Sequence, residues 1–250
     1  MAFPALDRAW PVVHFEEIDS TNEEAQRRAR LGDRGPVWIQ ADFQTAGRGR
    51  MGRSWASPSG NLCATAFFTS SDPPARTALL SFAAALALHE AVGGLRADNR
   101  DLRLKWPNDL MWADAKIAGI LIETGAISGG LWVAAGFGVN IATAPNVPGR
   151  RTGRLADLPG GGGIRPLDLL DALEVSFRGW LSTFRDHGFE PVREAWKERA
   201  AGLGQRIGLS PAHGSLEGIF RDLGPDGALI LELDGGDLRH IRAGEISVLG

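Results

Sequence analysis

The sequence predicts an α+β protein, with helices packed on a mixed, largely antiparallel sheet and a small all-β unit at the C-terminus. An alanine- and leucine-rich segment, residues 75–95, has the composition of a buried helix. Between Leu102 and Asn140, turns alternate with short apolar runs, which indicates antiparallel hairpins and not βαβ units. After Gly204, short strand-like runs alternate with turns such as PDG and DGG.

The totals describe an ordinary globular chain of one large domain, or a large and a small one, with 250 residues, 44% hydrophobic and 23% charged. A net charge of −3 disfavours bulk nucleic-acid binding. Cys63 is the only cysteine, so no internal disulfide can form and a reducing compartment fits best. The N-terminus has no signal-peptide pattern, and no uninterrupted apolar run approaches the roughly 18 residues of a membrane span. We expect a cytoplasmic protein with neither nucleic acid nor membrane as a partner.

The N-terminal region predicts a strand followed by a helix. Residues 11–17 alternate weakly, as a strand does. Ser20 and Thr21 each precede a glutamate by three residues, which is capping-box spacing, and the helix should end near Gly32. These polar groups are either helix caps or side chains that face a pocket.

A basic, glycine-rich loop, residues 43–55 (FQTAGRGRMGRSW), separates apolar strands predicted at 37–42 and 61–69. Three arginines and three glycines within seven residues suit a loop that closes over an anion, because glycine permits close approach and arginine fits phosphate or carboxylate. A solvated basic turn is the alternative. The glycines match G-x-G-x-x-G, but Pro58 and Gly60 prevent the helix that a dinucleotide-binding fold requires.

The middle of the chain predicts strands at 102–106, 117–123 and 131–139, with a turn at KWPND. Gly136 and Gly138 lie two residues apart and therefore on one face of the last strand. Something other than a side chain can lie on that face. A tight contact between sheet and helix is the alternative explanation.

Lysine is rare, since the chain contains only Lys105, Lys116 and Lys197. Two of the three fall within twelve residues. This suggests a task that arginine cannot perform, although chance clustering remains an alternative.

The last third predicts an irregular segment at 142–165, amphipathic helices at 166–184 and 191–201, and then five short strands. The strands form a β-barrel that is too small to count on standing alone. We place a domain boundary near Ala201 to Gly204, giving domains 1–202 and 203–250.

The order STN, QTAGRGRMGR, KWPNDL, a lysine eleven residues after the first, GFGVN and a small β-barrel resembles biotin protein ligases, from Val12 to Leu249. The resemblance implies a class II synthetase-like catalytic domain and an SH3-like C-terminal β-barrel. We expect the monofunctional class, because no helix-turn-helix fits before Val12. Met51 departs from the polar or basic residue that many members carry, and we expect only a tuning effect.

The resemblance implies a two-step reaction. Biotin and ATP, with Mg²⁺, form biotinyl-5′-AMP, and a lysine of a biotin carboxyl carrier protein then takes the biotin. The carrier would belong to acetyl-CoA carboxylase or another biotin-dependent carboxylase, and the ligase would be a monomer or a homodimer.

The resemblance also implies roles for individual residues. The catalytic residues would be Lys116, Arg50 and Asp109, with Asp109 also a candidate magnesium ligand. The implied biotin-binding residues are Ser20, Thr21, Asn22, Gln44, Gly47, Arg48, Lys116, Gly119, Gly136 and Gly138. The implied ATP-binding residues are Arg50, Arg53, Trp55, Lys105, Asn108, Lys116 and Asn140.

Three other functions compete with this one. A lipoate–protein ligase has the same fold and adenylate chemistry, and only the resemblance, through Gln44 and the GRGR loop, favours biotin. A non-catalytic module that binds biotin or a nucleotide is disfavoured by the presence of both Lys105 and Lys116. Nucleic-acid binding by the arginine loop is disfavoured by the acidic net charge.

Overall fold

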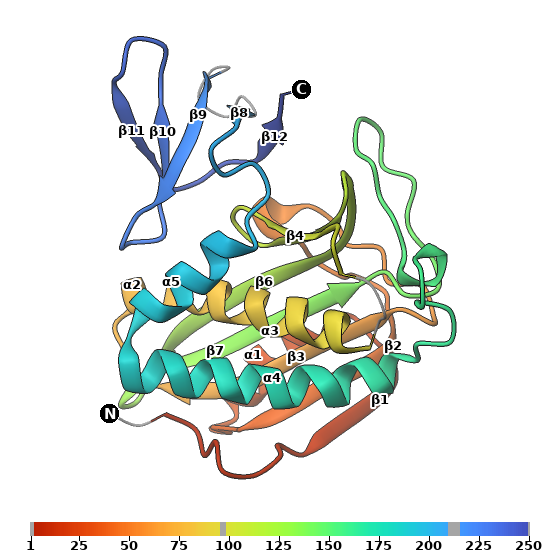
Figure 1. Ribbon diagram of the computed structural model, residues 1–250. Helices are drawn as coiled ribbons and strands as arrows, with labels where there is room; N and C mark the ends of the chain where they lie inside the picture. The colour runs from red at the N-terminus through yellow and green to blue at the C-terminus, as the bar shows by residue number, and fades with distance from the viewer. Residues whose placement is uncertain (1–2, 96–98, 210–215, 250) are drawn as a thin grey trace.

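The computed structural model describes residues 3–95, 99–209 and 216–249, which form a large mixed sheet with helices on both faces and a small sheet beyond it (Figure 1). The large sheet has the strand order β1-β2-β3-β7-β6-β5-β4. The β1–β2 pair is parallel and the other pairs are antiparallel, so the sheet is mixed and largely antiparallel, as predicted. Its strands are β1 (Val12–Ile18), β2 (Val37–Gln44), β3 (Leu62–Ser70), β4 (Leu102–Lys105), β5 (Asp109–Trp112), β6 (Ala115–Ile127) and β7 (Gly130–Val139).

The two faces of the sheet are covered differently. Helix α1 (Thr21–Arg30) lies on one face, where Ala25 and Ala29, four residues apart, pack with Ile39 and Phe67. Helices α3 (Leu80–Gly94) and α4 (Pro166–His187) cover the other face (Figure 1). Because α1 is only ten residues long, it leaves part of this face of the sheet uncovered, and the candidate site lies there.

The alanine-rich segment is two helices and not the single helix 75–95 that was predicted. Helix α2 (Pro74–Ala78) ends at Leu79, where i→i+3 hydrogen bonds tighten the backbone before α3 begins. By length and composition, Pro74–Gly94 could cross a membrane, but 67% of its apolar window is buried inside the protein. Such burial is typical of a core helix, here packed between the sheet and α4.

The two later helices differ from their predicted bounds. Helix α4 begins at Pro166, as predicted, but continues to His187, beyond the predicted end at residue 184. Helix α5 (Phe189–Glu198) begins and ends before the predicted 191–201. Gly188 separates it from α4, with φ of 78°, a left-handed conformation that favours glycine. The segment 142–165 is irregular apart from a 3₁₀ turn at Leu155–Asp157, as predicted.

The small sheet is antiparallel, in the order β11-β10-β9-β8-β12. Among the described residues its pairing is open between β11 and β12. Ser210, residues 214–215 and Gly250, which the predicted strands included, lie outside the described residues. Lys197 of α5 joins Asp222 of this sheet across 3.1 Å. The strands are β8 (Arg206–Leu209), β9 (Leu216–Leu223), β10 (Leu229–Glu232), β11 (Leu238–Ile241) and β12 (Ile246–Val248).

We predict that Phe177→Ala lowers the free energy of unfolding by about 3–5 kcal/mol, because it opens a cavity in the aromatic core. The Phe177 ring lies 5.7 Å from both Trp38 and Phe137, measured between centroids. Urea unfolding measures the change. Val175→Ala on the same helix is the control, since Val175 is 63% exposed and should cost no more than about 0.5 kcal/mol. Equal effects of both substitutions would contradict this packing.

Candidate active site

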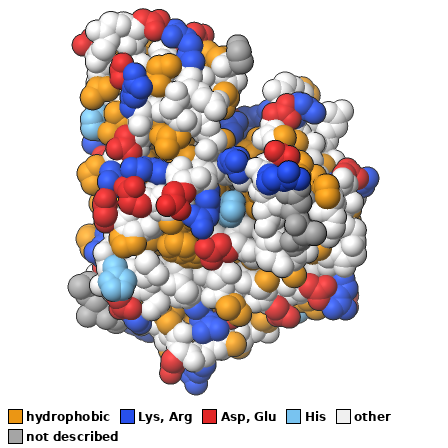
Figure 2. All heavy atoms as spheres, in the orientation of Figure 1, with side chains coloured by type: hydrophobic (Ala, Val, Ile, Leu, Met, Phe, Trp, Pro, Cys, Tyr) orange, Lys and Arg blue, Asp and Glu red, His pale blue; other side chains and the backbone are white. Residues whose placement is uncertain are grey.

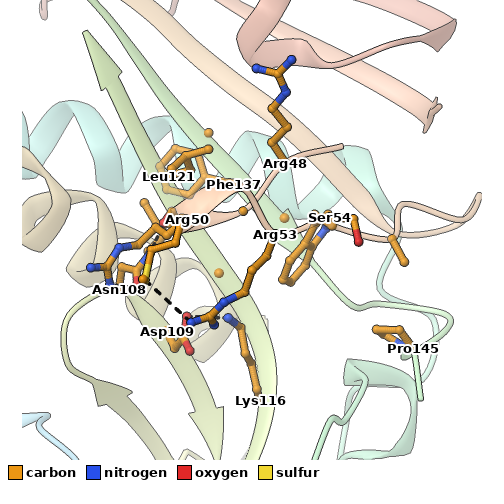
Figure 3. Close-up of a pocket in the computed structure, with 18 of the residues that line it drawn as sticks. Arg48, Arg50, Arg53, Ser54, Asn108, Asp109, Lys116, Leu121, Phe137 and Pro145 are labelled. Atoms are coloured by element: carbon orange, nitrogen blue, oxygen red, sulfur yellow. Dashed lines mark hydrogen bonds and ion pairs between the residues drawn. The ribbon is translucent and has the colours of Figure 1, made fainter. Parts of the chain in front are cut away.

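A cavity of about 660 Å³ opens on the α1 face of the large sheet, within the range of about 300–1,000 Å³ usual for small-molecule sites (Figure 3). The N-terminus of α1, the arginine loop, the turn before β5, strands β6 and β7, and residues 145–152 surround it. All predicted site residues except Gly47 and Lys105 line the cavity. Those that do are Ser20, Thr21, Asn22, Gln44, Arg48, Arg50, Arg53, Trp55, Asn108, Asp109, Lys116, Gly119, Gly136, Gly138 and Asn140.

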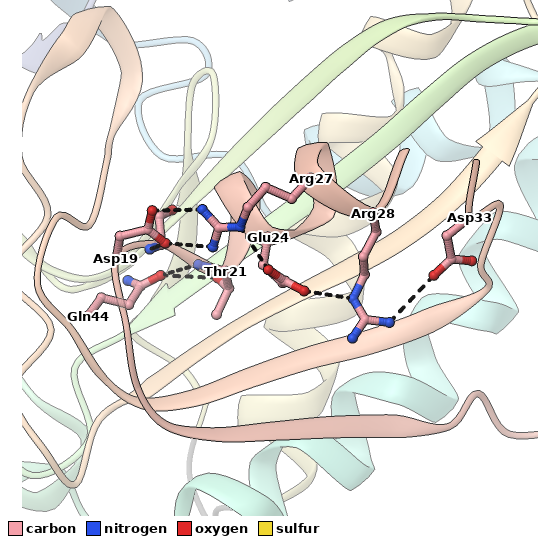
Figure 4. Close-up of polar contacts among 8 residues, drawn as sticks. Asp19, Thr21, Glu24, Arg27, Arg28, Asp33 and Gln44 are labelled. Atoms are coloured by element: carbon pink, nitrogen blue, oxygen red, sulfur yellow. Dashed lines mark hydrogen bonds and ion pairs between the residues drawn. The ribbon is translucent and has the colours of Figure 1, made fainter. Parts of the chain in front are cut away.

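The N-terminus of α1 forms the polar, uncharged end of the cavity. Asp19 pairs with Arg27 at 2.8 Å and accepts the Ser20 N–H at 2.7 Å, which fixes the turn into the helix (Figure 4). The hydrogen bond from Arg27 holds the pKa of Asp19 below its ordinary value. Ser20 occupies the N-cap position, but its side chain makes no cap hydrogen bond, so the predicted capping box is wrong.

Gln44 and Gly47 hold the arginine loop against this end. Gln44 Oε1 accepts the Thr21 backbone N–H at 2.8 Å (Figure 4), and its Nε2 donates to Ser57 Oγ at 2.8 Å. Gly47 accepts the Trp55 N–H at 2.8 Å, and a Cβ at Gly47 would overlap the Trp55 carbonyl. Gly47 therefore lies behind the cavity wall and allows the loop to close.

The arginine loop is a small hairpin that sends its guanidinium groups in different directions. The backbone of Arg48 forms an antiparallel β-bridge with Ser54. The Arg48 side chain extends toward α1, where it forms an ion pair with Glu23 at 2.5 Å (Figure 3). Arg50 instead donates to Asn108 Oδ1 at 3.2 Å. Met51 at the tip has φ of 58° and is 68% exposed.

A β-bulge brings Lys116 onto the cavity face. Asp109 pairs with Gly119, but the register shifts by one residue so that Met111 pairs with Lys116. Without this shift, Lys116 would point to the opposite face from Gly119, since side chains alternate along a strand. As a result, Lys116 Nζ reaches Asp109 Oδ1 at 2.6 Å (Figure 3).

The three glycines of the floor are covered by side chains of this chain. A Cβ at Gly136 would overlap the Asn22 amide, so the alternative explanation, a tight contact between sheet and helix, is correct at this position. A Cβ at Gly138 would overlap the Trp55 indole, which also lies over Gly119. Lys116 Nζ lies 5.4 Å from the Trp55 ring centroid, a cation–π distance. Trp55 thus forms an apolar wall beside the lysine.

Two cations near the cavity have no carboxylate within ion-pair distance among the described residues. Burial lowers the pKa of Arg50, against the attraction of Asp109. Burial likewise lowers the pKa of Lys105. Lys105 lies in an adjoining cavity of about 280 Å³, with Arg150 and Arg151. The two cavities share Asp109, Lys116, Arg150 and Glu245.

Glu245, which precedes β12, was not predicted. It accepts from Arg53 at 2.9 Å and from Arg150 at 2.5 Å, and so links the small sheet to two loops of the site. Burial favours a raised pKa for Glu245, but Arg150, Arg53 and Lys105 outweigh burial and lower it. No sequence signal marked Glu245, since its partner Arg53 lies 192 residues away.

Asp109 is the carboxylate that was predicted to hold a magnesium ion. The described residues contain no group of three or more His, Cys, Asp or Glu side chains that could hold a metal. Asp109 contacts Lys116, and Asn108 Oδ1 accepts from Arg50. Magnesium often takes one or two protein carboxylates together with substrate phosphates, so Asp109 fits the ion only alongside a nucleotide.

The sequence matches the Biotin/lipoate A/B protein ligase family over residues 15–140, and the Biotin protein ligase C terminal domain over residues 202–249. It is 39% identical to the biotin–[acetyl-CoA-carboxylase] ligase of Paracoccus denitrificans, over 85% of this chain and 90% of that protein. It is 33% identical to the bifunctional ligase/repressor BirA of Escherichia coli, over 92% of this chain and 72% of that protein.

Solved structures have the same fold. The biotin protein ligase from Aquifex aeolicus in complex with biotin and ATP superposes with a TM-score of 0.79, at 24% identity, over 96% of this chain and 98% of that one. The enzyme from Leishmania major in complex with biotinyl-5-AMP gives 0.66 at 25% identity, over 93% and 99%. The fold and the site define a ligase of the biotin and lipoate type. The chain belongs to the biotin protein ligase family.

We predict that Glu245→Gln lowers stability at neutral pH and that this loss disappears in acid. The folded pKa of Glu245 lies below its ordinary value of 4.5. Its stabilisation is therefore complete above that value and is lost as pH falls through the folded pKa. Urea unfolding at pH 7, 4.5 and 3 measures this, with Glu16→Gln on the exposed edge strand as control. A difference from wild type that does not change with pH would contradict the assignment.

Proposed function

We propose that the chain activates biotin as biotinyl-5′-AMP and transfers it to a lysine of a biotin carboxyl carrier protein, in acetyl-CoA carboxylase or another biotin-dependent carboxylase. The observation that carries the proposal is the position of Lys116. The bulge in β6 places its ammonium beside Asp109, at the edge of the glycine floor, in the cavity that Arg50 and Arg53 also line. Two anions can be brought together there.

The cavity has two chemically different ends, as biotin and ATP require. Ser20, Thr21 and Gln44 offer neutral donors and acceptors that suit a ureido ring. Leu121 and Trp55 offer apolar surface for the bicycle and the valeryl chain. At the other end of the cavity, Lys116, Arg50 and Arg53 provide positive charge for a carboxylate and a triphosphate.

In the first step, a biotin carboxylate oxygen forms a bond to the α-phosphorus of ATP, and the bond to the leaving pyrophosphate oxygen breaks. The two reactants repel each other, so fixed positive charge in a dry site supplies much of the catalysis. Lys116 would exchange its contact with Asp109 for a bridge between carboxylate and α-phosphate. A compact ammonium suits this crowded position better than a planar guanidinium.

In the second step, the carrier lysine attacks the acyl carbon of the adenylate, AMP leaves with the bonding electrons, and the amine loses a proton. The mixed anhydride must be kept from water until the carrier arrives. The hairpin of Arg48, Arg50 and Arg53 would close over it.

The remaining ATP contacts follow from the positions of the side chains. Asn140 Oδ1 is buried and has no hydrogen-bond partner among the described residues, while its Nδ2 donates to the Gly153 carbonyl, so an acceptor is left for the nucleotide. Lys105, in the adjoining cavity, and Asn108 would serve the phosphate end. Asp109 would hold magnesium together with phosphate oxygens, and the ion would add positive charge there.

A lipoate substrate fits less well. Its dithiolane ring has no N–H or carbonyl group, so the hydroxyl and amide groups of Thr21 and Gln44 that face the cavity would lose water and gain no hydrogen bond from the substrate. Leaving buried polar groups unsatisfied is costly, and a site built to hydrogen-bond its substrate rejects analogues that cannot do so. This favours biotin.

We also propose that residues 1–202 form the catalytic domain and residues 203–250 the C-terminal domain, in a cytoplasmic protein that is a monomer or homodimer. Nucleic acid and membrane are not proposed as partners. Acidic and basic side chains are interspersed on the face shown in Figure 2, without a single-sign field, and the net charge is −3.

We predict that Lys116→Ala lowers biotin-dependent ATP–pyrophosphate exchange by about 10²–10³-fold, the effect expected when one preorganised charge-stabilising group is removed. Lys197 on α5, which pairs with Glu194, lies outside the cavity, and Lys197→Ala should leave exchange nearly unchanged. Equal losses in the two variants would remove the role assigned to Lys116.

We predict that Arg50→Gly lets the adenylate escape, because the hairpin loses its buried guanidinium and its hydrogen bond to Asn108. The escaped adenylate would biotinylate unrelated proteins, which a streptavidin blot with added serum albumin detects. Arg242→Gly, which changes an exposed arginine outside both cavities, is the control. Strict carrier specificity in Arg50→Gly would contradict the role of the loop.

A further inference from the structure

A chain of hydrogen bonds runs from the polar end of the cavity to a carboxylate outside it. Glu123 on β6 accepts from the Asn22 amide, with 2.7 Å between Oε2 and Nδ2. Asn22 Oδ1 lies 2.6 Å from Thr65 Oγ1 on β3, and Thr65 Oγ1 lies 2.8 Å from Thr21 Oγ1. Thr21 and Asn22 line the cavity, whereas Thr65 and Glu123 do not.

Strand register holds these groups at one level of the sheet. Gly136 on β7 lies opposite Thr65 on one side and Leu121 on the other. Glu123 is two residues from Leu121 and so points to the same face. Because Gly136 has no side chain, the Asn22 amide lies over β7 and spans from Thr65 to Glu123.

The carboxylate sets the direction of this chain. An ionised carboxylate only accepts hydrogen bonds, so Asn22 must turn its NH₂ group toward Glu123 and its oxygen toward Thr65. Thr65 is fully buried and has one hydroxyl proton, which it donates in a hydrogen bond to the Asn22 oxygen. The Thr65 oxygen is then an acceptor, and the Thr21 hydroxyl donates to it.

The opposite direction is unfavourable. If Thr65 donated to Thr21, and Thr21 to Gln44 Oε1 at 3.1 Å, the oxygens of Thr65 and Asn22 would face each other at 2.6 Å with no proton between them. Gln44 Oε1 does not need the hydroxyl proton, because it already accepts the Thr21 backbone N–H. The Thr21 proton is therefore directed away from the cavity, and a lone pair faces inward.

We propose that Glu123 and Thr65 are positioning residues which, through Asn22, make the Thr21 hydroxyl oxygen an acceptor for a ring N–H of the substrate. The inference rests on the proposed function, in which that N–H belongs to the ureido group of biotin. It explains why a carboxylate that does not reach the cavity lies behind a neutral site.

The test compares Glu123→Gln, Thr65→Val and the double variant. A glutamine can both donate and accept, so Asn22 loses its fixed orientation, and valine removes the Thr65 proton. Each single variant should raise the Kd for biotin in calorimetry, and the KM for biotin in ATP–pyrophosphate exchange, about tenfold, the effect of one hydrogen bond. The kcat at saturating biotin should stay within about twofold, because Lys116 is untouched.

The double variant should bind biotin no more weakly than the single variant with the lower affinity, because both substitutions break the same chain of hydrogen bonds. Thr65→Ser, which keeps the hydroxyl, should restore the wild-type KM. Glu16→Gln and Thr69→Val, which change matched side chains outside the cavity on β1 and β3, are the controls.

Unchanged Kd and KM in both single variants, a fall in kcat as large as the rise in KM, or multiplying effects in the double variant would overturn the proposal. The proposed function fails in a different way: the wild type would then bind biotin without any biotin-dependent exchange, and the Kd series would still test the chain of hydrogen bonds. A wild type that does not bind biotin would contradict both.

Discussion

Partly buried positive charge is the constraint on which the arrangement of this site depends. Lys116, Arg53 and Arg150 each face a carboxylate, but Arg50 and Lys105 are half-buried without one among the described residues. A charge that is partly removed from water and has no counter-charge nearby costs free energy, which the rest of the fold must offset. A site that holds such charge is prepared for an anion, and the carboxylates of Asp109 and Glu245 keep its other cations in place until that anion arrives.

The sheet offers a rigid surface for these charges. The bulge at the start of β6 aims Lys116, and the glycines of β7 make room for Asn22 and Trp55. Asn61 anchors the chain that leaves β7, since its Oδ1 accepts the backbone N–H groups of Ile141, Ala142 and Thr143. Polar recognition at one end and charge at the other thus rest on neighbouring strands.

The sequence predicted those parts of the site that depend on local chemistry. The arginine loop, the lysine pair and the paired glycines all carried a local signal, and so did the antiparallel hairpins from Leu102 to Asn140. The bulge that aims Lys116 could not be predicted, because a bulge has no recognisable pattern in a single sequence. Strand alternation alone would put Lys116 and Gly119 on opposite faces of the sheet. Glu245, Thr65 and Glu123 were missed for a different reason: their roles come from pairing between distant segments. The helix prediction at 75–95 failed at Leu79 because tight turns within an apolar run leave no compositional mark.

We propose that the partly buried cations of the site bring the biotin carboxylate to the α-phosphate of ATP. The most direct test of this proposal is ATP–pyrophosphate exchange by the purified protein with biotin, with lipoate and with neither acid. We expect exchange that requires biotin and is not supported by lipoate. Exchange with lipoate alone would keep the chemistry but contradict the role of the polar end of the cavity. No exchange with either acid would mean that the cations serve something other than adenylation, and would contradict the account.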